Sequence, residues 1–162
     1  MEQKNQSLNM EDKIYTIKNL SFLDVHNIVE SVRTKSCSSP HFSAQVIPHV
    51  TLFDNTRTHI SISLMSPPAN IIVANVKIYI PDTNTDYAFI HDLYVNPEVR
   101  YNHFSTFLME LAIGVIRDLG FKGFYLHVTK GTWMEEWYKR MGYIVDEEHC
   151  TEEYVQFYKD FK

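Results

Sequence analysis

Hydrophobic residues recur at helical spacing in three segments of the chain. In the longest, 104–119, apolar side chains follow an i, i+3, i+4, i+7 rule, and Gly120 stands where a C-terminal cap belongs. Shorter helices are predicted over 22–33 and from 132 to a stop at Gly142. The start of each shorter helix carries a capping-box pattern, Ser21 with Asp24 and Thr132 with Glu135.

Alternating apolar and polar residues predict strands around these helices. The segment 34–55 is irregular and could hold a short second helix before a strand. The resulting element order is β-α-(α)-β-β-β-α-β-α-β-β. It predicts an α+β fold, in which helices flank both faces of a mixed, mostly antiparallel central sheet. The predicted strands are 13–20, 59–65, 71–80, 87–95, 121–128, 143–149 and 153–161.

Composition and charge narrow the class of protein. The chain has 162 residues, of which 44% are apolar and 22% charged, as in an ordinary globular domain. We expect residues 1–12 to form a flexible tail and 13–162 to form one domain. The net charge of −5 argues against nucleic-acid binding, which needs clustered cations. The sequence has no long apolar run and no secretory signal, and it has only two cysteines, so we expect a cytoplasmic protein without membrane contact.

Three motifs between residues 87 and 144 carry the candidate chemistry. A strand ends in Leu93-Tyr94-Val95-Asn96-Pro97, the loop Arg100–Ser105 opens the long helix, and Trp137–Tyr143 closes the later one. In their order and spacing these segments resemble the GNAT superfamily of N-acetyltransferases. The resemblance implies a GNAT-like sheet and acetyl-CoA as co-substrate. The eight histidines show no metal-ligand spacing, so no metal site is expected.

The resemblance also implies how acetyl-CoA is held. In the family, amides of the loop and of the helix N-terminus wrap the pyrophosphate, and two loop glycines let the backbone approach closely. Here His103 and Ser105 stand at the positions of those glycines. Backbone groups of the preceding strand would hold the acetyl carbonyl and the pantetheine arm. The expected binding residues are Leu93, Tyr94, Val95, Arg100, Tyr101, Asn102, His103, Phe104, Ser105 and Thr106.

Catalytic candidates follow from the same resemblance. Tyr138 matches the tyrosine that protonates the leaving thiolate, although it also suits a buried helical stripe. His127 lies in a Leu-His-Val run similar to that of protein N-terminal acetyltransferase catalytic subunits, where the histidine is the base. His91 and Asp92 compete for this role, and strand alternation would put only one of them on the ligand side. Phe89 replaces the usual glutamate or tyrosine.

The expected activity is therefore acetyl transfer to a primary amine by direct attack. The acceptor would be a protein N-terminus, a lysine or a small amine, and the protein a monomer or homodimer. The departures at Phe89, His103 and Gly131, where the family commonly has asparagine, leave a second interpretation open. In that interpretation the chain is a catalytically inactive GNAT-like module that binds a partner protein.

Overall fold

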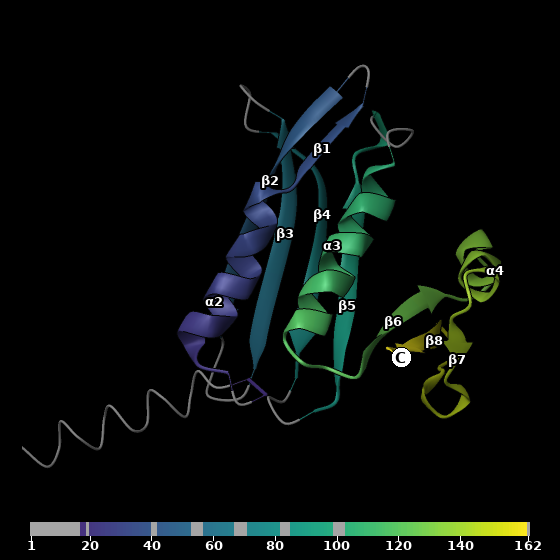
Figure 1. Cartoon of the computed structure of the whole chain (residues 1–162). Helices are drawn as coiled ribbons and strands as arrows, with labels where there is room; N and C mark the ends of the chain where they lie inside the picture. The colour runs from purple at the N-terminus through teal and green to yellow at the C-terminus, as the bar shows by residue number, and fades with distance from the viewer. Residues whose placement is uncertain are drawn as a thin grey trace, which may run out of the picture.

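Eight strands form one sheet, and the helices of the described chain pack against it (Figure 1). The computed structural model describes residues 17–18, 20–39, 42–52, 57–66, 71–81, 85–98 and 103–161. The strand order is β1-β2-β3-β4-β5-β6-β8-β7, and every neighbouring pair is antiparallel except β5 and β6. The elements are α2 (Phe22–Glu30), η1 (Ser31–Thr34), β1 (Ser36–Ser39), β2 (Phe42–Leu52), β3 (Thr58–Ser66), β4 (Ile71–Ile80), β5 (Tyr87–Val95), α3 (Phe104–Asp118), β6 (Gly123–Thr129), α4 (Trp133–Arg140), β7 (Ile144–Val145), η3 (Glu147–His149) and β8 (Tyr154–Asp160).

One face of the sheet, called here the covered face, holds the core. Along β4 the residues 74, 76, 78 and 80 are fully buried, and the residues between them are only half-buried, as expected when one side of a sheet is covered. The helices α2 and α3 lie side by side across this face (Figure 1). Their buried residues, among them Val25, Val29, Leu108 and Ile116, supply the apolar stripes that the sequence predicts.

The third helix, α4, packs on the same face. Its Tyr138 ring lies 5.7 Å from the ring of Phe157, which is fully buried and pairs with Leu126. Leu126 in turn pairs with Ile90. The side chains of Phe157, Leu126 and Ile90 therefore all point to the covered face. The α+β class and the mostly antiparallel sheet are confirmed. The expectation of helices on both faces is wrong for the described α-helices, because their apolar stripes meet a sheet that is buried on one side.

Three further sequence predictions differ from the structure. Residues 36–39 and 42–52 form the hairpin β1–β2, so the short second helix considered there is absent from these described residues. The predicted strand 143–149 shrinks to β7, and η3 follows it. Of the predicted strand 13–20, only 17, 18 and 20 are described. They form a tight turn in which Ile17 bridges Leu20 and Lys18 has a φ of 51°. The predicted tail, 1–12, lies outside the described residues.

Within the described chain, no helix combines the length and the apolar character needed to cross a bilayer.

Candidate active site

The parallel strands β5 and β6 separate part of the way along their length. They pair over four residues, up to Ile90 opposite Leu126, and beyond that point β5 continues to Val95 and β6 to Thr129. Backbone groups on the facing edges of 91–95 and 127–129 have therefore left the β-ladder between these strands. A gap of this kind exposes N–H and C=O groups to any extended ligand that enters it.

A β-bulge in β5 lies at the start of this gap. The pairing of β4 with β5 shifts register between Asn75 and Lys77, and Asp92 has a φ of 52°. This local twist brings the Asp92 and His91 side chains together, with Asp92 Oδ2 lying 3.2 Å from His91 Nδ1 and 3.6 Å from Lys77 Nζ. Regular alternation would put these two side chains on opposite faces of the strand, but the bulge interrupts the period of two and they lie in contact.

The N-terminus of α3 follows the end of β5 along the chain. Its N-cap residue, His103, is exposed and has φ 58° and ψ 25°, a left-handed conformation that favours glycine. The N–H of Phe107 bonds to the His103 carbonyl, so in the first turn the amides of Ser105 and Thr106 have no carbonyl partner inside the helix. Its first turn carries no acidic side chain. An anion would be favoured here by the helix dipole.

The structure places the predicted acetyl-CoA residues as follows. Leu93 is half-buried, Tyr94 is exposed and Val95 is buried at the end of β5. Phe104 is a core side chain, Ser105 is half-buried and Thr106 is exposed. The remaining three, Arg100, Tyr101 and Asn102, lie outside the described residues.

Tyr138 packs against β8 from the covered face. Its side chain is 3% exposed, and its ring packs between those of Tyr143, at 5.1 Å, and Phe157. Burial raises the pKa of the Tyr138 phenol. The hydroxyl therefore keeps its proton at neutral pH, as a proton donor must.

His127 points to the opposite, open face. It is exposed and lies one residue after Leu126, whose side chain is on the covered face. The His127 ring stacks on Tyr154 at 3.9 Å and lies 4.7 Å from Phe89. Tyr138 and His127 therefore face the same strand pair from two sides. This arrangement can protonate a leaving group on one side while a base acts on the other.

Accessibility separates the three candidate bases. The Nε2 atom of His91 is buried and has no hydrogen-bond partner among the described groups, and burial is the main cause that lowers the pKa of this imidazole. Asp92 is 61% exposed at its side chain and lies beside the Lys77 ammonium. His127 combines an exposed ring with ordered contacts, so it is the best placed of the three.

A chain of hydrogen bonds runs from His127 toward β8 and η3. His127 Nε2 lies 2.8 Å from Gln156 Oε1, and Gln156 Nε2 donates to Asp146 Oδ2 at 3.2 Å. Asp146 Oδ2 also lies 2.8 Å from His149 Nδ1. The sequence analysis missed Gln156 and Asp146, because no motif marks them and only the register of β6 with β8 brings them to His127.

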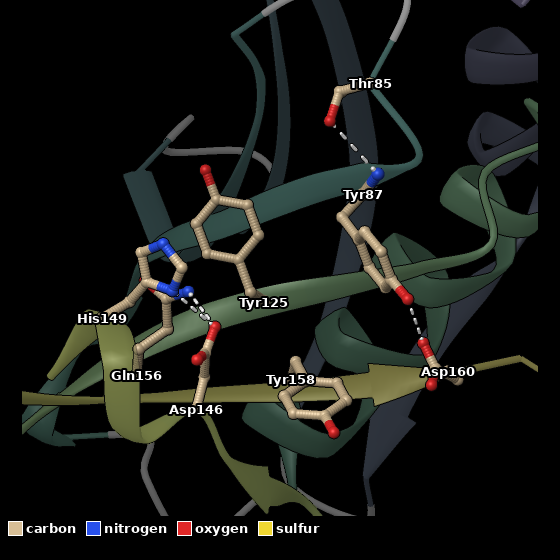
Figure 2. Close-up of a pocket in the computed structure, with 8 residues that line it drawn as sticks. All are labelled: Thr85, Tyr87, Tyr125, Asp146, His149, Gln156, Tyr158 and Asp160. Carbon is tan, nitrogen blue, oxygen red and sulfur yellow. Dashed lines mark hydrogen bonds and ion pairs between the residues drawn. The ribbon is translucent and has the colours of Figure 1, made fainter.

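Three of these groups, Gln156, Asp146 and His149, help to line a hollow of about 600 Å³ on the open face. Figure 2 shows Tyr125 and Gln156 beside Asp146 and His149 at one end. At the other end the Tyr87 hydroxyl donates to Asp160. The hollow therefore offers phenol rings and two carboxylates, a lining suited to a cationic group.

The parting of the parallel strands β5 and β6 and the N-terminus of α3 agree with the fold that the resemblance to the GNAT superfamily implies. The sequence comparison agrees: the model of the Acetyltransferase (GNAT) family matches residues 33–143. The chain belongs to the GNAT acetyltransferase family. Comparison with curated proteins finds no match.

Solved structures of similar fold have low sequence identity to this chain. PaiA N-acetyltransferase from Thermoplasma acidophilum, in complex with coenzyme A, is 14% identical with a TM-score of 0.54, over 64% of this chain and 61% of its own. An acetyltransferase from Bacillus cereus is 20% identical with a TM-score of 0.51, over 65% and 74%. A protein from Bacillus anthracis, in complex with acetyl coenzyme A, is 17% identical with a TM-score of 0.50, over 64% and 63%. The chain thus spans less than two thirds of the first and third of these proteins.

Proposed function

We propose that this protein transfers the acetyl group of acetyl-CoA to a primary amine by direct attack within a ternary complex. The parting of β5 from β6 carries the proposal, because the exposed His127 imidazole lies beside it on the open face, while the buried Tyr138 phenol packs under the adjacent strand β8 on the covered face. The structural neighbours solved with coenzyme A and acetyl coenzyme A support the choice of donor.

The residues present fit acetyl-CoA in two ways. Beyond Ile90 and Leu126 the strands β5 and β6 no longer pair with each other, and this separation suits the amides of a pantetheine arm, which needs alternating donors and acceptors. The α3 N-terminus suits a pyrophosphate, since the Ser105 and Thr106 amides have no partner within the helix and no acidic side chain of that turn repels an anion. His103 does not remove these amides, because its side chain is exposed.

The proposed proton transfers use one residue on each face. Acetyl-CoA supplies an acyl group activated as a thioester. His127 takes one proton from the acceptor ammonium, and the freed nitrogen lone pair forms the C–N bond. Tyr138 gives its proton to the sulfur, which keeps the electron pair of the broken C–S bond. The second proton lost by nitrogen restores the phenol through water, and the proton on His127 leaves to solvent, so one proton is released per turnover.

Calorimetric titration with acetyl-CoA tests the donor site directly. We expect saturable binding well below millimolar ligand. The absence of binding at millimolar acetyl-CoA would contradict the proposal and favour the inactive, partner-binding module. Where binding occurs, release of free thiol should be measured with three acceptors: a peptide with a free α-amine, an α-blocked lysine peptide, and 1,4-diaminobutane.

Tyr138→Phe tests the proposed acid. We expect turnover to fall at least about tenfold while the affinity for acetyl-CoA stays nearly unchanged, because only the leaving thiolate needs the hydroxyl. Tyr143→Phe is the matched control, since it removes a hydroxyl from the neighbouring ring of the same cluster. Equal turnover in wild type and Tyr138→Phe would exclude Tyr138 from the mechanism.

A further inference from the structure

The amide of Gln156 lies between an imidazole and a carboxylate, and the carboxylate fixes its orientation. Asp146 Oδ2 lies 3.2 Å from the Gln156 amide, and an ionised carboxylate can only accept hydrogen bonds. The Gln156 NH₂ group must therefore face Asp146, which leaves the carbonyl oxygen Oε1 toward His127. The second contact of Asp146 Oδ2, with His149 Nδ1 at 2.8 Å, engages the same oxygen.

This orientation decides which nitrogen of His127 carries the proton. A carbonyl oxygen can only accept, so the 2.8 Å contact between Gln156 Oε1 and His127 Nε2 requires a proton on Nε2. In a neutral imidazole the other nitrogen, Nδ1, then has the lone pair. Stacking of the ring on Tyr154 at 3.9 Å limits the flip that would exchange the two nitrogens.

We infer that Gln156 and Asp146 are positioning residues: together they hold His127 as the Nε2–H tautomer and so make Nδ1 the nitrogen that accepts a proton. The tautomer follows from the hydrogen bonds alone, and only its use as a base rests on the proposed function. His149, which is 63% exposed at its side chain, connects the chain of hydrogen bonds to solvent.

Few other charges face the His127 ring. The rings that face it are the phenols of Tyr125 on β6 and Tyr154 on β8 and the phenyl ring of Phe89 on β5. The nearest carboxylate in the hydrogen-bond chain is that of Asp146, beyond the Gln156 amide. A change of charge at position 156 should therefore dominate the electrostatics of the ring.

The nitrogen chemical shifts of ¹⁵N-labelled histidine report the tautomer in the protein without substrate. For wild type, above the pH at which the ring is protonated, we expect the Nε2–H form at His127. In Gln156→Lys an ammonium that can pair with Asp146 must donate to Nε2, so the proton should move to Nδ1. A wild-type Nδ1–H form, or an unchanged form in Gln156→Lys, would overturn the inference.

Kinetics test what the tautomer does. The exchanged pair Gln156→Glu with Asp146→Asn keeps one carboxylate, one amide and the net charge, but it places the carboxylate against His127. The acid limb of the kcat/KM profile should then rise by about one pH unit. Gln156→Lys should lower kcat about 100-fold, with KM for acetyl-CoA nearly unchanged. An unmoved acid limb in the exchanged pair, or full activity in Gln156→Lys, would refute the positioning role.

Gln45→Lys and Gln45→Glu are the matched controls. Gln45 is exposed on β2, five strand steps from β8 in the sheet, so it receives the same charge changes about 24 Å away. These variants should keep the wild-type tautomer and pH profile. If acetyl-CoA does not bind even to wild type, the proposed function fails, but the tautomer measurement still stands on its own.

Discussion

His103 is the residue at which this chain departs most from a glycine-rich anion loop. Glycine adopts this φ of 58° without steric strain, whereas the Cβ of histidine destabilises the conformation by roughly 1–2 kcal/mol. The backbone at position 103 therefore has the left-handed conformation that glycine favours, although the residue there is histidine. The conformation, rather than the residue type, preserves the turn into α3.

His103→Gly should stabilise the protein by about 0.5–1 kcal/mol, because the relief of strain exceeds the entropy that glycine adds to the unfolded chain. Urea denaturation measures this change. The affinity for acetyl-CoA should be kept or improved if the imidazole only crowds the loop.

His103→Ala is the control, since alanine removes the ring but keeps the strained Cβ. It should give no gain in stability. A marked loss of acetyl-CoA affinity in both variants would show that the ring itself contacts phosphate, and a loss of stability in the glycine variant would contradict the strain argument.

At the site, local sequence predicted single residues but not their partners. His127 and Tyr138 were predicted because each lies in a short motif that resembles the family, and this prediction needs no knowledge of the neighbouring strands. The partners of His127 were not found, because Gln156 is 29 residues away and meets it only through strand pairing. The joint position of His91 and Asp92 was missed for a similar reason, since the bulge depends on the register with β4.

At the scale of elements, two helices with the same predicted cap begin differently. Before α2 the Ser21 hydroxyl accepts from the Asp24 N–H at 3.2 Å, and the Asp24 carboxylate accepts from the Ser21 N–H at 3.4 Å, which completes the capping box. Before α4 the Thr132 hydroxyl instead donates to the Thr129 carbonyl at 2.7 Å and leaves the helix amides uncapped by its side chain.

Ser21→Ala should therefore cost about 1 kcal/mol of unfolding free energy. Thr132→Ala should cost about half of that or less, because only a partly exposed side-chain to backbone bond is lost. Urea denaturation of the two variants side by side makes each the control of the other. Equal losses would mean that the hydroxyl contacts at one of these helix starts differ in solution.

The elements that the sequence predicted best are those whose pattern repeats. The helix α3 and the strands β3 and β4 each carry a period over nine residues or more, and their predicted bounds, like those of β5, agree with the structure to within a residue or so. The hairpin β1–β2 was missed because a serine-rich run and Pro48 hide the alternation. Pairing with β3 stabilises β2 although its local sequence pattern does not predict a strand, and Pro48 lies buried opposite Ile62 in this pairing.

For the molecule as a whole, the two faces of the sheet have different chemistry. The covered face is aliphatic and aromatic core, whereas the open face carries a row of rings from β3 to β8 that touch one another at centroid distances of 3.9–6.3 Å. Such a row would guide a flat or cationic acceptor toward His127. Its members are His59, Tyr79, Phe89, His91, Tyr125, His127 and Tyr154.

Two histidines of this row link stability to pH. Burial is the largest cause that lowers the pKa of both His59 and His91, and for each of them Asp92 acts in the opposite direction while Lys77 reinforces the lowering. Since their pKa values in the folded state lie below the unfolded value of about 6.5, their contribution to stability is fully present above that pH. It is lost as the pH falls through the folded pKa, because the unfolded chain then binds more protons.

The free energy of unfolding should therefore fall between pH 7 and pH 5, and His91→Gln should make that fall shallower by several tenths of a kcal/mol or more. Urea denaturation at pH 7, 6 and 5 measures the slope. His49→Gln, which removes an exposed histidine from β2, should leave the slope nearly unchanged. Equal slopes in wild type and His91→Gln would mean that the His91 ring is protonated at no cost in the folded protein, and the buried, unpaired Nε2 would then have to find a partner at low pH.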